Sequence, residues 1–157
     1  MDDFQIRPQN PQDASGICEV HIASIRILNG PFYSSEQIET WAGRCRPDRY
    51  EVVDRLGEGH FVAEKDGRIV GFSNVKGAEL TGCYVSPLAV GRGIGSGLCA
   101  AAEAWALGQG HVELNCSSSL QAVGFYLKRG FKKIGEKRFM LNQEVGLESI
   151  SMRKRLR

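Results

Sequence analysis

Hydrophobic and polar positions in the first third of the chain repeat first with the period of a strand and then with that of a helix. Residues 4–7 alternate apolar and polar side chains before Pro8, which is typical of a strand. Residues 13–28 instead carry apolar side chains at helical spacing, and an Asn-Gly-Pro sequence follows them. The elements predicted here are a strand over 4–7, a helix over 13–28, a helix from Ser34 or Ser35 to Ala42, and a short helix with a loop over 47–59.

The middle of the chain predicts a meander of three strands followed by a helix. Apolar-rich runs at 60–64 and 68–75 are joined through Asp66-Gly67, and Asp-Gly between two such runs favours a tight hairpin. A third strand is expected over 79–85. Residues 93–107 then follow a helical pattern. The apolar face of this helix is expected to hold Ile94, Leu98, Ala101 and Trp105.

The last third is predicted to add a strand, a helix and two further strands. The helix is expected over 118–129, with Ser118 and Gln121 in a capping-box arrangement and Gly130 ending it. The strands are expected over 112–116, 131–141 and 145–152.

The order of these elements predicts an α+β fold with a mixed sheet. Because a helix separates the strands at 79–85 and 112–116, these two strands are expected to pair in parallel through a right-handed crossover. No repeat or linker interrupts the pattern, and 157 residues is an ordinary length for one domain. A single domain over 1–157 is therefore expected.

Composition and charge narrow the class of protein. With 42% apolar and 24% charged residues, the chain has the composition of a globular protein and not of a disordered one. It has no apolar stretch of the roughly 20 residues that a membrane helix needs. Lys and Arg total 20 against 18 for Asp and Glu, a net charge of +2 that does not favour a nucleic-acid partner.

Cysteine and histidine usage bears on compartment and on metals. The five cysteines are odd in number and include no C-x-x-C pair, which favours reduced thiols and a cytoplasmic location. The three histidines stand apart in the sequence, without the spacing of a metal-binding motif. No metal site is predicted.

A run of alternating glycines lies where the third strand of the meander gives way to the helix. Glycine occupies positions 91, 93, 95 and 97, although each glycine in a helix costs about 0.8–1.0 kcal/mol relative to alanine. Glycine lets the backbone approach a bulky partner, and a helix N-terminus offers N–H groups and positive dipole charge. Together with the guanidinium of Arg92, these features predict a site for a phosphate or pyrophosphate.

Two common nucleotide-binding motifs do not fit this glycine run. The Walker motif needs Gly-Lys-Ser/Thr, and no lysine follows the glycines. The G-x-G-x-x-G motif would need glycine at position 96 or 98, where the chain has Ser96 and Leu98. Local chemistry alone also allows a flexible glycine-rich turn that binds no ligand.

Two sequence blocks resemble the GNAT superfamily of acyl-CoA-dependent N-acyltransferases. The family signature Gln/Arg-x-x-Gly-x-Gly/Ala cradles the pyrophosphate of coenzyme A. It is matched at Gly93 and Gly95, while Val90 stands where the family usually has Gln or Arg. Residues 122–131, AVGFYLKRGF, are similar to the family's A-x-x-F-Y-x-x-x-G-F block. The resemblance implies a mixed, mostly antiparallel sheet with a parallel β-α-β cofactor-binding core flanked by helices, and acetyl-CoA as cosubstrate without a metal.

The resemblance also implies cofactor-binding roles. Cys83, Tyr84 and Val85 lie on the strand whose backbone pairs with the pantetheine arm in this family. Ser119 occupies the position of an asparagine that touches the cofactor in many members, and Tyr126 matches the tyrosine that faces the thioester sulfur. The pyrophosphate is expected at Val90, Gly91, Arg92, Gly93, Gly95 and Ser96.

Acyl transfer to an amine requires a base for the amine and an acid for the departing thiolate. A lysine-like amine has a pKa near ~10.4 and is protonated at neutral pH, whereas a phenol such as that of Tyr126 can donate a proton. Glu79 stands at the offset where the histone-acetylating branch of the family places its base. Period-two alternation puts Glu79 on one strand face with Thr81, Cys83 and Val85.

Each catalytic assignment has a structural alternative. Tyr126 also fits a core aromatic residue beside Val123 and Leu127. Glu79 also fits a solvated turn residue, in which case a water chain could take the proton of the amine. Cys83 and Cys116 would act as nucleophiles only in a ping-pong mechanism, and buried structural thiols are the favoured interpretation for them.

In the family, the first two helices and the loop between the last strands shape the acceptor site. Tryptophan and histidine at such positions also fit core packing or a helix surface, and carboxylates there are usually solvated. The candidates in these segments are His21, Tyr33, Glu36, Trp41 and Glu144.

The function predicted is transfer of an acetyl group from acetyl-CoA to a primary amine of a small molecule or peptide, by direct attack in a ternary complex. A non-catalytic module that binds acyl-CoA as a sensor or scaffold is the main alternative. A nucleotide- or nucleic-acid-binding protein is a third, disfavoured by the failed motifs and the balanced charge. Homodimers are frequent in the family, so a homodimer is a further expectation.

Overall fold

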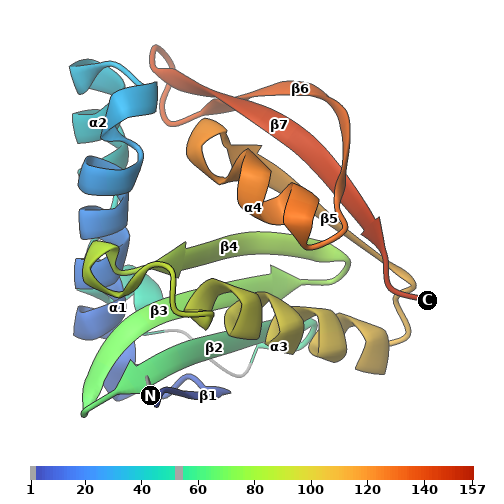
Figure 1. Cartoon of the computed structure of the whole chain (residues 1–157). Helices are drawn as coiled ribbons and strands as arrows, with labels where there is room; N and C mark the ends of the chain where they lie inside the picture. Colours follow the sequence, from blue (N-terminus) through green and yellow to red (C-terminus); the bar gives the residue numbers. More distant parts are fainter. Residues whose placement is uncertain (1–2, 52–54) are drawn as a thin grey trace.

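Hydrogen-bonded strands between Gln5 and Arg155 form a seven-stranded sheet in the described residues (Figure 1). The computed structural model describes residues 3–51 and 55–157. The strands lie side by side in the order β1-β2-β3-β4-β5-β7-β6. Their bounds are β1 Gln5–Pro8, β2 Glu58–Lys65, β3 Arg68–Lys76, β4 Glu79–Val85, β5 Glu113–Ser119, β6 Lys132–Met140 and β7 Gly146–Arg155.

Neighbouring strands in this sheet pair antiparallel, with one exception. β4 and β5 run parallel, and the helix between them makes the crossover that the sequence predicts. The other neighbours, from β1–β2 to β6–β7, are antiparallel. The predicted α+β class, with a mostly antiparallel sheet around one parallel β-α-β unit, is therefore confirmed.

The helices lie on both faces of the sheet. In β2, Val62 packs against Ile17 of α1 on one face, whereas its neighbour Ala63 packs against Leu98 of α3 on the other. Such alternation is the period of a strand buried on both sides. Figure 1 shows α3 lying over β2 and β3, and α4 lying beside β5. The helices are α1 Ala14–Ala23, α2 Ser35–Ala42, α3 Ile94–Gly108 and α4 Val123–Lys128.

Several local predictions are confirmed, and two helices differ in detail. The Asp66-Gly67 turn has positive φ at both residues, 51° and 76°, as the hairpin requires. The predicted helix over 13–28 consists of α1 and a π-helical turn, Ser24–Leu28, that widens its last turn. On α3 the buried positions include Ile94, Leu98, Cys99, Ala102 and Ala106, whereas Ala101 and Trp105 are half-buried.

The capping box predicted at Ser118 and Gln121 does not form. β5 continues to Ser119, and the Ser118 hydroxyl donates to the Ser119 carbonyl at 2.8 Å. The turn Leu120–Ala122 then leads into α4 at Val123. β5 pairs with β7 along its whole length, so ladder hydrogen bonds with a distant strand override the local capping signal.

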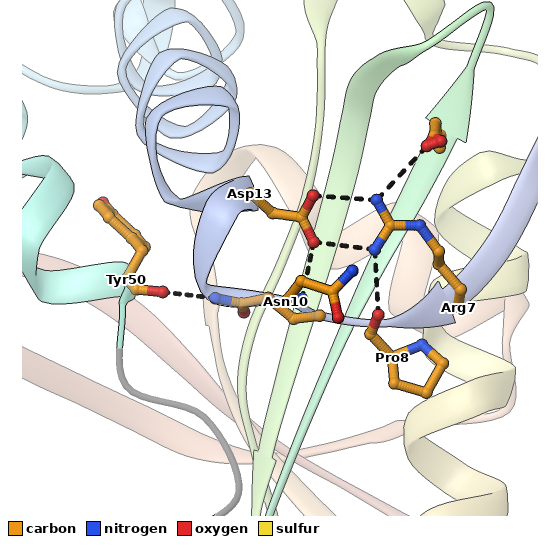
Figure 2. Close-up of polar contacts among 7 residues, drawn as sticks. Arg7, Pro8, Asn10, Asp13 and Tyr50 are labelled. Atoms are coloured by element: carbon orange, nitrogen blue, oxygen red, sulfur yellow. Dashed lines mark hydrogen bonds and ion pairs between the residues drawn. The ribbon is translucent and has the colours of Figure 1, made fainter.

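An ion pair joins β1 to the turn before α1. The guanidinium of Arg7 donates to both carboxylate oxygens of Asp13, at 2.8 and 2.9 Å, and the Asn10 N–H donates to the same carboxylate at 2.7 Å (Figure 2). The Asp13 side chain is 10% exposed. The hydrogen bonds from Arg7 hold the pKa of Asp13 below its ordinary value of 3.8. This pair fixes the angle at which the chain leaves the sheet to begin α1.

Among the described residues, no helix is both long and apolar enough to span a membrane.

Replacing Asp13 with asparagine is expected to lower the free energy of unfolding by about 1.5–3 kcal/mol, because a largely buried, charge-assisted pair is lost. A carboxylate whose pKa is lower in the folded state stabilises the fold above its unfolded pKa, and this contribution disappears as the pH falls through the folded pKa. The variant should therefore lose less stability than the wild type on acidification below about pH 4. Urea unfolding on either side of that pH measures both effects.

Glu39→Gln is the matched control. Glu39 pairs with Arg26 at 2.9 Å, but the two side chains are 60% and 54% exposed, so the change should cost less than about 1 kcal/mol. An Asp13→Asn variant as stable as Glu39→Gln, with the acid sensitivity of the wild type, would show that the Arg7 pair contributes nothing.

Candidate active site

The site begins where β4 and β5 separate. The two strands pair only at Glu79 with Asn115 and at Leu80 with Cys116. Beyond Leu80, β4 stays paired with β3 up to Val85, so its other edge has no strand partner in the described residues. Unpaired backbone N–H and C=O groups are therefore available along residues 82–85.

A β-bulge in β4 decides which side chains face which side of the sheet. Asn74 pairs with Gly82 and Val75 with Leu80, so Thr81 is an extra residue in the ladder. Strict alternation predicts Glu79 on the same face as Cys83 and Val85, and this prediction is wrong. The extra residue interrupts the alternation of side chains between the two faces of β4, so residues before and after Thr81 no longer follow one period-two pattern.

The two faces of β4 beyond the bulge have different neighbours. Cys83 and Val85 pack toward α3, where the Cys83 thiol contacts the Gly95 carbonyl at 3.8 Å. Glu79 instead lies on the same cavity wall as Tyr84.

A cavity of about 340 Å³ lies between β4, the N-terminal end of α3 and α4. We call it the glycine-loop cavity. Gln121, Ala122, Phe125, Ser24 and Leu28 also line it; the last two come from the π-helical turn, which no sequence signal pointed to. Arg92 is exposed and is not part of the lining. The predicted cofactor residues that do line it are Cys83, Tyr84, Val85, Val90, Gly91, Gly93, Gly95, Ser96, Ser119 and Tyr126.

The glycine loop has a backbone conformation that favours glycine. Gly91 and Gly93 have φ of 78° and 83°, a region that costs other L-residues about 1–2 kcal/mol. The first intrahelical bond of α3 runs from the Gly97 N–H to the Gly93 carbonyl at 3.0 Å. The N–H groups of residues 94–96 therefore precede the hydrogen-bonded ladder, at the positive end of a helix of 15 residues.

Gly95 keeps the helix end close to the far wall of the cavity. A Cβ added there would lie 3.2 Å from the Phe125 ring and 3.5 Å from the Val85 side chain. The loop thus combines exposed N–H groups with a surface free of side chains, which suits a bulky oxyanion such as a pyrophosphate.

Tyr126 belongs both to the core and to this cavity. Its ring packs edge-on against Phe125 and Phe131, with centroids 5.1 and 5.2 Å away, and the residue is 5% exposed. It also lines the glycine-loop cavity. Burial raises the pKa of the Tyr126 phenol well above its ordinary value. The phenol is therefore protonated at neutral pH and can donate a hydrogen bond.

A second cavity, of about 480 Å³, lies on the α1–α2 face of the sheet. We call it the aromatic cavity, after His21, Tyr33, Trp41, Tyr50 and Tyr84 in its wall. It adjoins the glycine-loop cavity where β4 and β5 separate. The residues that line both cavities are Leu80, Thr81, Gly82, Tyr84, Ser117 and Ser119.

The predicted acceptor residues His21, Tyr33 and Trp41 all line the aromatic cavity, whereas Glu36 and Glu144 do not. Trp41 is buried and packs edge-on against the Tyr33 ring. The Tyr33 hydroxyl donates to the Glu148 carbonyl at 2.8 Å and accepts from the Leu120 N–H at 2.9 Å. Tyr33 and Trp41 therefore also hold α2 against the C-terminal strands.

His21 is held without charge in this wall. Its Nδ1 lies 2.7 Å from the Tyr50 hydroxyl and 3.4 Å from the Cys45 sulfur. Its ring packs against the Tyr84 ring with the centroids 4.3 Å apart and the planes tilted by 43°. Burial, with a smaller contribution from the positive charge of Arg44, lowers the pKa of His21 to about 4. His21 is therefore a neutral imidazole at neutral pH.

Charged residues that the sequence did not single out also line the aromatic cavity. Arg44 and Arg49 come from the segment after α2, and Lys137 comes from β6. Glu79 is the one carboxylate among the described lining residues. In residues 3–51 and 55–157, no three His, Cys, Asp or Glu side chains are grouped as a metal site would need.

Comparison with known proteins agrees with this geometry. A family model for the acetyltransferase (GNAT) domain matches residues 30–156. The structure of the GCN5-related N-acetyltransferase from Rhodopseudomonas palustris is 33% identical, with a TM-score of 0.88 over 99% of this chain and 97% of that one. Comparison with curated proteins gives no match.

Two more distant structures share the fold. The PaiA N-acetyltransferase of Thermoplasma acidophilum, solved in complex with coenzyme A, is 23% identical, with a TM-score of 0.81 over 98% of this chain and 99% of that one. The acetyltransferase YncA of Salmonella typhimurium, solved with acetyl-CoA, is 18% identical, with a TM-score of 0.70 over 98% and 94%. From the family match and the Rhodopseudomonas relative, the chain belongs to the GNAT family of acetyl-CoA-dependent N-acetyltransferases.

Proposed function

We propose that this protein transfers the acetyl group of acetyl-CoA to a primary amine of a small molecule or peptide, by direct attack in a ternary complex. One observation carries the proposal. Two cavities with shared lining residues meet where β4 and β5 separate, and a protonated phenol lines the first of them. Acetyl-CoA and the amine that accepts the acetyl group could therefore meet while each stays in its own cavity.

The glycine-loop cavity fits coenzyme A. The N–H groups of residues 94–96 and the glycines with positive φ suit the pyrophosphate, and the unpaired edge of β4 at Cys83–Val85 suits the amide groups of the pantetheine arm. Ser119 would offer a hydroxyl at the boundary between the cavities. Val90 contributes no side-chain donor, so the grip on the pyrophosphate depends mainly on backbone N–H groups.

Tyr126 would act on the leaving group. Acetyl-CoA supplies the acetyl group as a thioester, and transfer to an amine breaks its C–S bond and forms a C–N bond. A phenol with a raised pKa keeps its proton at neutral pH, so we expect Tyr126 to donate a hydrogen bond to the sulfur as negative charge develops there.

Glu79 is the candidate for taking the proton of the amine. It lines the aromatic cavity directly before Leu80 and Thr81, which line both cavities. The bulge at Thr81 thus places the carboxylate on the side from which the acceptor would approach. Glu79 is exposed, so water could carry the proton between the amine and the carboxylate.

The cysteines near the site support direct attack over a covalent acyl-enzyme. Cys83 lines the glycine-loop cavity, but burial raises the pKa of its thiol well above the ordinary value, and burial raises that of Cys116 to about 12. Thiols of this kind are not ionised at neutral pH and are poor nucleophiles.

A panel of amines tests the proposal against the alternative of a non-catalytic acyl-CoA-binding module. Release of free thiol from acetyl-CoA in the presence of an amine supports catalysis. Thermal stabilisation by acetyl-CoA without thiol release supports the binding module. A ligand at 100 times its Kd should stabilise the protein by about 2.7 kcal/mol, and equal stabilisation by ATP or NAD would contradict the coenzyme A assignment.

Substituting Gly93 with alanine is expected to weaken coenzyme A binding at least about tenfold. The reason is that a Cβ is unfavourable at φ 83°, so the loop would relax and turn its N–H groups away from the pyrophosphate. Gly108→Ala is the control, because Gly108 lies near the other end of α3 with nothing within 4 Å of an added Cβ. Titration calorimetry with coenzyme A measures both, and equal affinities would contradict the loop's role.

Tyr126→Phe is expected to lower kcat by at least about 100-fold, because the donor to the departing sulfur is lost. The affinity for acetyl-CoA should change by less than about twofold. The variant should keep its fold, since no described group accepts a hydrogen bond from this hydroxyl while the ring packing is unchanged. Steady-state kinetics and acetyl-CoA titration separate the two effects, and an undiminished kcat would remove Tyr126 from the mechanism.

Glu79→Gln is expected to remove or shift the acidic limb of the kcat/KM profile against pH, because that limb reports protonation of the base in the free enzyme. Glu36→Gln is the matched control, an exposed carboxylate on α2 outside both cavities, and should leave the profile as it is. If the acidic limb is the same in Glu79→Gln and the wild type, the base is another group or a water chain.

A further inference from the structure

The charge of the aromatic cavity differs from that of the chain as a whole. Arg44, Arg49 and Lys137 against Glu79 give its described lining three cationic side chains and one carboxylate, a local charge of +2. The whole chain of 157 residues also carries only +2. His21 adds no charge at neutral pH. Positive charge is therefore concentrated in this cavity.

The two arginines contact neutral groups at the cavity. The guanidinium of Arg44 lies 5.8 Å from the centre of the Phe139 ring, and Arg49 donates to the Arg44 carbonyl at 3.0 Å. None of the three cations forms an ion pair with a carboxylate of the described residues. Elsewhere in those residues, arginines that do pair with carboxylates are Arg7, Arg26, Arg46, Arg129, Arg138 and Arg153.

Lys137 and the next two residues of β6 differ in where their side chains lie. Lys137 and Phe139 line the aromatic cavity, whereas Arg138 between them pairs with Glu148 at 2.6 Å. Alternation along the strand thus sends a neutralised cation away from the cavity and an unneutralised one toward it.

These cations do not serve the coenzyme A pyrophosphate. Arg44, Arg49 and Lys137 are absent from the lining of the glycine-loop cavity. A cleft with one sign of charge attracts ligands of the opposite sign, and arginine forks bind carboxylates and phosphates through paired hydrogen bonds. The same field would repel an acceptor whose only charges are several ammonium groups.

Resting on the proposed acetyl transfer, we propose that the acceptor is a small amine that also carries an oxyanion, a carboxylate or a phosphate, which Arg44, Arg49 and Lys137 bind in the aromatic cavity. The cavity volume of about 480 Å³ suits a small molecule. Binding of the oxyanion would leave the amine free to reach Glu79 and the boundary with the glycine-loop cavity. The cations position the acceptor and take no part in the chemistry.

Matched pairs of amines test this specificity through thiol release from acetyl-CoA. The pairs are γ-aminobutyrate with butylamine, and phosphoethanolamine with ethanolamine, with spermidine as a polycation. The member that carries an oxyanion should, in at least one pair, have a kcat/KM about tenfold or more above its partner without an oxyanion, and spermidine should be the poorest substrate. The better pair tells a carboxylate site from a phosphate site. The proposal would be overturned if the amines without an oxyanion, or spermidine, had kcat/KM values equal to those of the amines that carry one.

Substitutions of the three cations test whether they bind the oxyanion. Lys137→Gln and the double change Arg44→Gln with Arg49→Gln should raise KM for the amine that carries an oxyanion by about tenfold. The kcat for that amine and the KM for its partner without an oxyanion should change by less than about twofold. Arg46→Gln is the control, since Arg46 is exposed, lies outside the cavity and pairs with Asp48. Lys137 is exposed, so its variant stays informative if the double variant fails to fold. An equal rise in KM for amines with and without an oxyanion would overturn the proposal.

Failure of the proposed acetyl transfer would give a different result from failure of the oxyanion site. If acetyl-CoA binds but no amine releases thiol, transfer is contradicted, and calorimetry with γ-aminobutyrate and phosphoethanolamine on the coenzyme A-loaded protein then decides the oxyanion site. Binding that is lost in Lys137→Gln supports recognition of the oxyanion. No binding of either compound overturns it.

Discussion

β4 and β5 are hydrogen-bonded through two residue pairs, Glu79 with Asn115 and Leu80 with Cys116, and both cavities exist because the strands part after them. A continuous ladder would close the edge of β4 and leave no passage between the faces of the sheet. β5 does not depend on β4 for its hydrogen bonds, since it pairs with β7 from Glu113 to Ser119. The sheet can therefore open at this point without leaving β5 unpaired.

Separated strands need support from elsewhere, and the two faces supply it differently. On the α3–α4 face, Glu103 accepts hydrogen bonds from Arg129 at 2.9 Å and Lys154 at 2.6 Å, which ties α3 to the end of α4 and to β7. Burial raises the pKa of Glu103, but these two cations outweigh that effect and hold it below the ordinary value. On the other face, Tyr33 joins the Leu120 turn to β7. Ionic and neutral hydrogen bonds thus brace the opening from both sides.

Local signals in the sequence predicted most of the elements and the glycine-loop wall, because those features depend on neighbouring residues. The hairpin at Asp66-Gly67 and the αL glycines at 91 and 93 follow from backbone sterics alone. The predictions that were wrong concern features that depend on pairing with segments distant in the sequence. The bulge at Thr81 arises from pairing with β3, and the extension of β5 past Ser118 arises from pairing with β7.

The aromatic cavity was predictable only in part for the same reason. Its aromatic residues stand in segments that the family resemblance pointed to, whereas its cations do not. Arg44, Arg49 and Lys137 are ordinary charged residues in the sequence, and what distinguishes them is that the fold brings all three to one cavity wall. That property depends on which side chains the fold brings together. No pattern along the chain can report it.

The position of Tyr126 explains how one residue can serve both packing and chemistry. Its ring is fixed between Phe125 and Phe131, so the phenol has little freedom to move. A donor held rigidly in an apolar setting stabilises developing charge more than a mobile one in water, because it needs no reorganisation when the charge appears. Burial therefore does not compete with a role at the thioester; it fixes the direction of the donor and keeps its proton in place. The same packing makes Phe125, which also limits the space above Gly95, the link between the pyrophosphate end of the glycine-loop cavity and the end where the bond would break.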